Sequence, residues 1–121
     1  MDGSTTMVLS NLFRLSEARE TAGLYAEEIR RHFDKRLHSI RLYGSAARGD
    51  WTPDSDIDIL VLLDSVSRED SDWLISRAVS LGILGSGFLI QPIFMSVADF
   101  DRLKARERRF AIEVEEQGIG L

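Results

Sequence analysis

Two groups of residues in the middle of the chain have the types and spacing that phosphate and metal chemistry requires. Gly44 and Ser45 come first, Arg48 follows, and Asp56 and Asp58 come after an interval of ten residues. Glycine lets the backbone approach a phosphate closely, and serine offers a hydroxyl. A short helix starting there would also direct backbone N–H groups at the anion. This segment is therefore predicted to be a phosphate-binding turn, to which Arg48 adds a positive charge.

Asp56 and Asp58 stand two residues apart at the head of an apolar run, residues 57–63. If that run is a β-strand, both carboxylates lie on one side of it. Paired carboxylates suit Mg²⁺, which takes one or two of them and completes its octahedron with water and substrate phosphates. The sequence thus predicts a magnesium site on this pair, next to the phosphate-binding turn.

The loop between the two groups contains residues with more than one interpretation. Arg48 could pair with Asp50 or Asp54 in a structural ion pair instead of binding phosphate. Asp50 and Asp54 are themselves typical turn residues, and neither shares the strand face of the aspartate pair. Trp51 could stack on a nucleobase or a partner, or simply cover the loop, and the sequence does not distinguish these roles.

The elements that must position these residues predict an α/β (α+β) domain, with a small mixed sheet of three or more strands flanked by helices. Apolar periodicity and turn residues define them. In order they are a helix over residues 17–35 capped by Ser16, strands over 40–43 and 57–63, a helix opened by a capping box at 67–70, a strand over 88–95, and a helix or broken pair of helices from 96–99 to Gly118.

Two of the predicted strands have a defined place in the sheet. The run over residues 57–63 is apolar except at Asp58, which is typical of a strand buried on both faces at the centre of a sheet. Pro92 cannot donate a ladder hydrogen bond, so the strand over residues 88–95 is expected at an edge or at a bulge.

Length and composition limit the classes of function. A chain of 121 residues is expected to form one domain, with residues 1–10 as a frayed leader rather than a secretory signal. The net charge of −5 disfavours extended nucleic-acid binding, and no apolar run reaches membrane-spanning length. The basic cluster over residues 104–109 is expected to be a solvated helix face, and His32 and His38 are expected at the surface. The absence of cysteine fits a cytoplasmic protein.

In the phosphate-binding turn and the aspartate pair, the chain resembles the minimal nucleotidyltransferase (MNT) family of the DNA polymerase beta superfamily. The signature of that family is Gly-Ser, a ten-residue interval and Asp-x-Asp. Here it is matched by Gly44-Ser45, residues 46–55 and Asp56-Ile57-Asp58, with GSAARG and SDIDILV matching the flanks. The C-terminal RRFAIEVEEQGIGL also resembles the way these small domains end, so the resemblance spans nearly the whole chain.

The resemblance implies transfer of a nucleoside monophosphate, AMP from ATP, to a hydroxyl, with two Mg²⁺ ions held by three carboxylates. Asp56 and Asp58 would be the catalytic metal ligands, and Gly44 and Ser45 would hold the terminal phosphates with Arg48 beside them. Small stand-alone members often pair with a helical HEPN-domain toxin, which they neutralise by binding or by adenylylating a tyrosine. The resemblance therefore implies an antitoxin with a HEPN-type partner.

The third carboxylate is where the sequence departs from the family. Alignment places Gln91 at its position, and no acid lies between Asp72 and Asp99. A glutamine supplies neither the charge nor a base. Three functions stay open: adenylylation of a partner protein, a nucleotide-binding antitoxin that acts by occlusion without catalysis, and nucleotidyl transfer to a small molecule of the aminoglycoside type.

Overall fold

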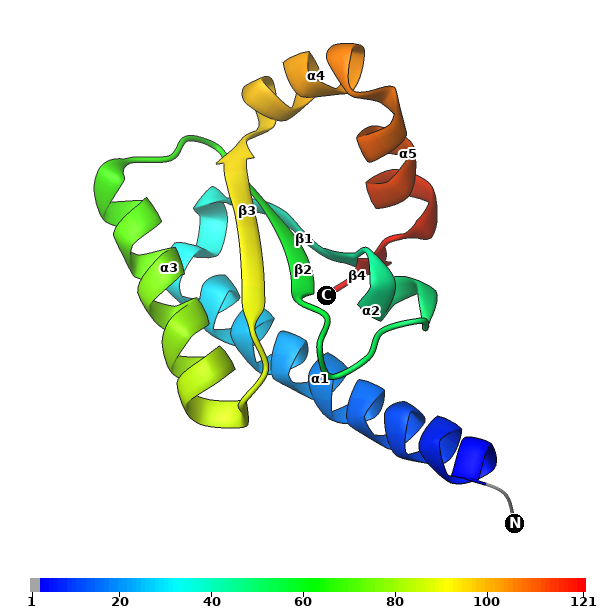
Figure 1. Ribbon diagram of the computed structural model, residues 1–121. Coiled ribbons are helices and arrows are strands. Elements are labelled where there is room, and N and C mark those ends of the chain that lie inside the picture. Colours follow the sequence, from blue (N-terminus) through cyan, green and yellow to red (C-terminus); the bar gives the residue numbers. More distant parts are fainter. Residues whose placement is uncertain (1–2) are drawn as a thin grey trace.

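The computed structural model describes residues 3–121, with side chains from Leu12 onward. Helices flank a four-stranded mixed sheet (Figure 1). In chain order the elements are α1 (Gly3–Phe33), a 3-10 turn (Asp34–Arg36), β1 (Leu37–Tyr43), α2 (Ser45–Arg48), β2 (Ile57–Leu63), α3 (Arg68–Leu81), a π-helical turn (Gly82–Ser86), β3 (Ile90–Ser96), α4 (Val97–Arg106), α5 (Arg108–Gln117) and β4 (Ile119–Gly120).

The strand order β3-β2-β1-β4 confirms the predicted mixed sheet. β2 pairs antiparallel with β1 and parallel with β3, so the most apolar run of the chain lies inside the sheet as expected. β3 forms an edge, in agreement with the restriction that Pro92 imposes. β4 was not predicted, because two residues are too few to show a period.

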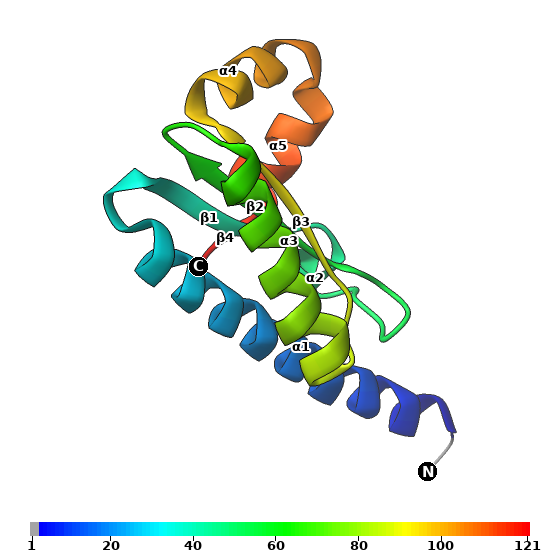
Figure 2. The same ribbon diagram turned by 90° about the vertical axis from the view of Figure 1, so that its left-hand side faces the viewer.

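The sheet separates two cores of different size. Figures 1 and 2 show α1 and α3 together on one side of the sheet and α4 and α5 on the other. Alternate residues of β2 enter the two cores: Ile59 and Val61 pack in the larger core with α1 and α3, and Leu60 and Leu62 in the smaller one with α4 and α5. Both faces of β2 are therefore covered by helices of the same chain.

The predicted start of the first helix is wrong. α1 begins at Gly3, so Ser16 lies within the helix and does not cap it. The chain has no proline between residues 3 and 33, and nothing in that stretch requires the helix to begin at a serine. Of the residues expected to form a frayed leader, Met1 and Asp2 lie outside the described residues and 3–10 are helical. The N-terminal turns of α1 extend past the rest of the molecule (Figures 1 and 2).

The capping box predicted at residues 67–70 is confirmed, and Ser96 caps α4. The Ser67 hydroxyl accepts a hydrogen bond from Asp70 N–H, and the Asp70 carboxylate accepts one from Ser67 N–H. At α4 the Ser96 hydroxyl accepts from Asp99 N–H. The C-terminal segment is a broken pair of helices, α4 and α5, that ends at Gly118. Among the helices described, none has the length and apolar character needed to cross a membrane.

Candidate functional site

The strand register places three polar side chains in one row. Asp58 of β2 is opposite Tyr43 of β1 on one side and opposite Gln91 of β3 on the other. Directly opposed residues point to the same face of a sheet, and this is the face that carries Leu60 and Leu62 toward α4 and α5. The structure thus places Gln91 beside Asp58, at the neighbouring position on the adjacent strand.

The phosphate-binding turn and the aspartate pair predicted from the sequence meet in the structure. Gly44 follows β1 with φ +70°, and a side chain built on it would overlap the carboxylate oxygen Oδ2 of Asp58. Only glycine tolerates both the positive φ and this close approach. Asp56 stands just before the first residue of β2, close enough to act electrostatically on Asp58. The two halves of the pattern therefore form one site.

The site carries an excess of negative charge. The pKa of Asp58 is raised to about 6, first by burial and then by the charges of Asp56 and Glu113, while Arg48 opposes the shift. Burial, Asp58 and Glu113 also raise the pKa of Tyr43, so its hydroxyl keeps its proton at neutral pH. A divalent cation between the carboxylates would relieve this repulsion.

Arg48 is held by two carboxylates in the structure. Its Nη1 lies 2.8 Å from Glu113 Oε1 on α5, and its Nε lies 3.5 Å from Asp50 Oδ1. The predicted pairing with Asp50 is therefore present, while Asp50 and Asp54 are both exposed, as expected of turn residues. Arg48 adjoins the turn, but a phosphate would have to compete with Glu113 for its guanidinium.

Glu113 was not identified from the sequence. It immediately precedes Val114, which is buried against the sheet, and follows Phe110 by one helical turn. Phe110 meets the Tyr43 ring edge to face, with centroids 5.5 Å apart. The apolar stripe of α5 was visible in the sequence, but the strand on which it packs was not. Nothing therefore indicated that Glu113 would face Asp58.

Trp51 covers the loop instead of being available to a nucleobase. Its side chain is 2% exposed and meets the Phe88 ring edge to face, with centroids 5.3 Å apart. Its indole N–H is buried and has no acceptor among the described residues. Of the two roles that the sequence left open, the structure favours packing.

The histidines and the basic cluster contribute nothing to the site. His32 and His38 are exposed, and His32 stacks on Trp73 with ring centroids 3.8 Å apart. Lys104 pairs with Glu115 at 3.1 Å, and the arginines of residues 104–109 are exposed, as expected of a solvated helix face.

The described residues contain no group of three or more His, Cys, Asp or Glu side chains arranged to hold a metal ion. Asp56 and Asp58 provide two carboxylate ligands, which fit Mg²⁺ if a substrate supplies further oxygens. With Gln91 in the row, the chain offers two carboxylates where the resemblance implied three. The two carboxylates therefore fit a metal ion whose remaining ligands come from a polyphosphate.

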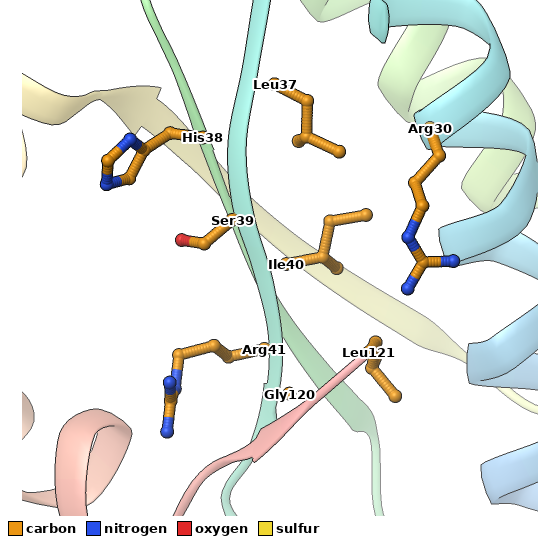
Figure 3. A pocket seen from close by; sticks show the side chains of 8 residues that line it. All are labelled: Arg30, Leu37, His38, Ser39, Ile40, Arg41, Gly120 and Leu121. Carbon is orange, nitrogen blue, oxygen red and sulfur yellow. The ribbon is translucent and has the colours of Figure 1, made fainter.

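Two surface hollows lie away from this site. One, of about 310 Å³, lies along the edge of β1 and is lined by Arg30, residues 37–41, Gly120 and Leu121. Figure 3 shows Arg30 on α1 facing Leu37 and Ile40, while His38, Ser39 and Arg41 point to the other side of the strand. The other, of about 280 Å³, lies between the sheet and helices α4 and α5. None of the predicted site residues lines either hollow.

Solved structures with the same fold include two toxin–antitoxin complexes. A crystal structure of a toxin–antitoxin with AMP-PNP matches at a TM-score of 0.52 with 23% identity, over 79% of this chain and 68% of that one. A mutant form of the toxin–antitoxin MntA-HpeT matches at a TM-score of 0.51 with 20% identity, over 78% of this chain and 68% of that one. These likenesses show the fold.

Sequence comparison identifies the family of the chain as well as its fold. A protein of Methanocaldococcus jannaschii, named a candidate protein adenylyltransferase, is 35% identical over 78 residues, which are 64% of this chain and 73% of the relative. The family model of the nucleotidyltransferase domain matches residues 25–119, from the C-terminal third of α1 to β4. The matched segment contains the turn at Gly44, the aspartate pair and the row across the sheet. The chain therefore belongs to the nucleotidyltransferase domain family of transferases.

Proposed function

We propose that this protein transfers a nucleoside monophosphate, AMP from ATP, to a hydroxyl group of a partner protein in a Mg²⁺-dependent reaction. The observation that carries the proposal is the close approach of the Asp58 carboxylate to Gly44, which places the predicted phosphate-binding turn against the carboxylate pair. Family membership supplies the reaction class. The name of the M. jannaschii relative supports a protein as the acceptor.

Each residue of the site has a defined role in this proposal. Asp56 and Asp58 hold Mg²⁺, and Gly44 and Ser45 receive the terminal phosphates, with Arg48 beside them. The bound metal would neutralise charge on the phosphates and on the attacking oxygen. The burial and neighbouring charges that raise the pKa of Asp58 to about 6 disfavour its ionised form, so protons are expected to compete with Mg²⁺ for the pair below about pH 6.

Glu113 competes with the nucleotide for Arg48. The ion pair between them is partly exposed on both sides, and such pairs contribute little to stability. A triphosphate offers the guanidinium more negative charge than one carboxylate does, so Arg48 is expected to turn from Glu113 to the phosphates when nucleotide binds. Tyr43 remains protonated beside Asp58 and presents a hydrogen-bond donor to the same face.

The partner we propose is a helical HEPN-type toxin, with this chain as its antitoxin in the cytoplasm. Structures of toxin–antitoxin complexes share the fold, and one of them contains AMP-PNP. The acidic chain has no extended basic run for nucleic acid, which is compatible with a protein acceptor.

The test is incubation of the protein with Mg·ATP and its co-encoded partner, followed by intact mass measurement of the partner. A gain equal to one AMP group is expected. Asp56→Ala and Asp58→Ala should each abolish the gain, because each removes a metal ligand, whereas Asp54→Ala in the neighbouring loop should not. A partner that gains no AMP from the wild-type protein contradicts transfer.

Non-catalytic neutralisation by occlusion is the second candidate, and Gln91 beside Asp58 is the observation that favours it. If occlusion is the mechanism, the double variant Asp56→Ala/Asp58→Ala still protects cells from the toxin. Loss of protection in that variant excludes occlusion.

The variant Gln91→Asp tests the effect of the missing carboxylate. If catalysis is limited by the missing charge, this variant should bind Mn²⁺ more tightly in the presence of a non-hydrolysable ATP analogue and transfer AMP faster, because it restores an acid beside Asp58. Gln91→Glu serves as the longer variant, and Gln117→Asp, on the exposed end of α5, serves as the control for added charge. Unchanged Mn²⁺ affinity in Gln91→Asp would show that position 91 is not a metal position.

A further inference from the structure

The helix α2 that follows Gly44 is a single turn, and its last carbonyl groups have no partner within it. Ala47 and Arg48 donate their N–H groups to Gly44 O, and Gly49 donates to Ser45 O. The helix ends at Arg48, so no further N–H of the helix reaches the carbonyl oxygens of Ala46 and Ala47. Ala46 is fully buried, which makes an unsatisfied carbonyl there costly.

Arg19 of α1 supplies the missing donors. Its Nε donates to Ala46 O at 2.9 Å and its Nη2 donates to Ala47 O at 3.2 Å. Both bonds come from one guanidinium, whose planar fork fixes two acceptors at once. Arg19 is separated from these residues by 27 and 28 positions in the chain, so the contact ties the long first helix to the turn.

We propose that Arg19 is a positioning residue for the phosphate-binding turn: it holds the carbonyl end of α2 so that Gly44 and Ser45 keep the orientation in which they receive the nucleotide phosphates. The inference rests on the proposed function of that turn. Arg19 touches neither the nucleotide nor the metal in this scheme, and it acts through the backbone of Ala46 and Ala47.

Arginine and lysine differ in this role. Lysine carries the same charge but has a single terminal nitrogen on a flexible stem, so it does not hold two successive carbonyls in one plane. If orientation matters, Arg19→Lys loses most of the effect of the arginine. If only a positive charge near the phosphates matters, Arg19→Lys retains it.

The experiment measures binding of a non-hydrolysable ATP analogue, and separately of inorganic tripolyphosphate, by calorimetry in the presence of Mg²⁺. Arg19→Met is expected to weaken both ligands by about tenfold, the change that corresponds to loss of one hydrogen-bonded charged group. Arg19→Lys is expected to lie closer to Arg19→Met than to wild type. Arg30→Met is the matched control, because Arg30 is an exposed arginine of the same helix that lines the hollow at the edge of β1 (Figure 3).

Two further measurements separate positioning from a general structural role. The thermal midpoint of each variant reports global stability, and amide chemical shifts of residues 44–49 report the turn itself. Positioning predicts weaker binding in a folded Arg19→Lys variant whose shifts change mainly in the turn. A variant whose midpoint falls while its affinity at a temperature well below that midpoint stays unchanged overturns the inference.

Ser45→Ala distinguishes failure of this inference from failure of the proposed function. If wild type binds the analogue and Ser45→Ala weakens binding while both Arg19 variants bind as wild type does, the function stands and the role of Arg19 is wrong. If wild type binds neither the analogue nor tripolyphosphate, both proposals are overturned.

Discussion

At the scale of single residues, Asp58 is the most constrained group of the site. It is flanked by Tyr43 and Gln91, contacts Gly44 and feels the charges of Asp56 and Glu113. Its pKa of about 6, against an ordinary value of 3.8, means that the folded protein binds its proton more tightly than the unfolded chain does. Its stabilising contribution is therefore fully present below about pH 4 and is lost as the pH rises through about 6.

Asp58→Asn should remove this pH dependence. In metal-free buffer the variant is expected to be more stable than wild type at pH 7.5, by an amount on the order of 1 kcal/mol because solvent screens a partly exposed carboxylate. The difference should shrink toward zero near pH 4. Urea unfolding at several pH values in EDTA measures it. A constant difference across this range would contradict the assigned pKa.

Gly44→Ala should damage the site more than it damages the fold. Alanine would have to adopt the unfavourable positive φ of Gly44, and its methyl group would displace the Asp58 carboxylate. Gly87→Ala is the control, because Gly87 has φ +84° and open space around it, so it carries the backbone cost alone. Gly87→Ala should lose about 1 kcal/mol of stability, Gly44→Ala should lose more because of the added overlap with Asp58, and Gly44→Ala alone should lose binding of the Mg·ATP analogue. If the two variants bound the Mg·ATP analogue equally well, the close approach of Gly44 to Asp58 would not matter for binding.

The sequence predicted that the turn and the aspartate pair belong to one site, and the structure brings Gly44 and Asp58 together, while their roles in binding stay a prediction. It did not indicate Glu113 or Arg19. Both act across long distances in the chain, Glu113 on Arg48 and Arg19 on Ala46 and Ala47. Nothing in their local sequence differs from that of an ordinary charged residue on a helix face, so only the packing of α1 and α5 reveals them.

At the scale of elements, the start of α3 shows how one aspartate serves two functions. The Asp70 carboxylate closes the capping box with Ser67 and also receives two hydrogen bonds from Arg36, at 3.0 and 2.6 Å. These contacts hold the pKa of Asp70 well below its usual range, the Arg36 hydrogen bonds being the main cause. The cap thereby joins α3 to the turn that precedes β1.

Asp70→Ala is expected to destabilise the protein by about 2 kcal/mol at neutral pH, since it removes both the cap and a buried acceptor. Because the pKa is lower in the folded state, this contribution is present above about pH 4 and is lost as the pH falls through the folded value. Urea unfolding of the variant beside Asp72→Ala, an exposed aspartate of the same helix, measures it. A loss in Asp72→Ala as large as that in Asp70→Ala would contradict the assignment.

The elements that have strong local sequence signals were predicted correctly, whereas those without such signals were missed. The run over β2, the caps at Ser67 and Ser96 and the proline in β3 each act within a few residues, so the sequence shows them directly. The apolar periodicity used to place the first helix did not mark its start at Gly3, and β4 forms only because β1 offers an edge. Those two features depend on tertiary context and were missed.

At the scale of the whole molecule, the proposed site lies on the more thinly covered face of the sheet. The larger core contains residues of α1 and α3, whereas α4 and α5 contribute only Phe100 and Val114 to the buried part of the smaller core. Arg41 adds hydrogen bonds from β1 to Val114 O and Gly118 O at the end of α5. Few buried side chains therefore hold the helices above Asp58.

Hydrogen exchange should detect this difference. Amides of α4 and α5 are expected to exchange through a local opening of lower free energy than the opening that exposes β1 and β2, because less apolar surface is uncovered. The denaturant dependence of exchange at low urea measures both. Arg41→Met should lower the free energy of the local opening and leave that of β2 unchanged. If the amides of α4, α5, β1 and β2 all exchanged with the same opening free energy, the two cores would not open separately and the prediction would be wrong.

The buried position of Trp51 gives the protein an internal optical reporter. The chain has two tryptophans, and Trp51 lies inside the loop that joins the turn to the aspartate pair, packed on Phe88. Trp73 lies on α3, outside that loop, and stacks on His32. The variant Trp73→Phe would leave Trp51 as the single tryptophan. Its fluorescence would then report changes in the surroundings of the loop when metal and nucleotide bind. Ligand binding could then be followed by fluorescence before any acceptor has been identified.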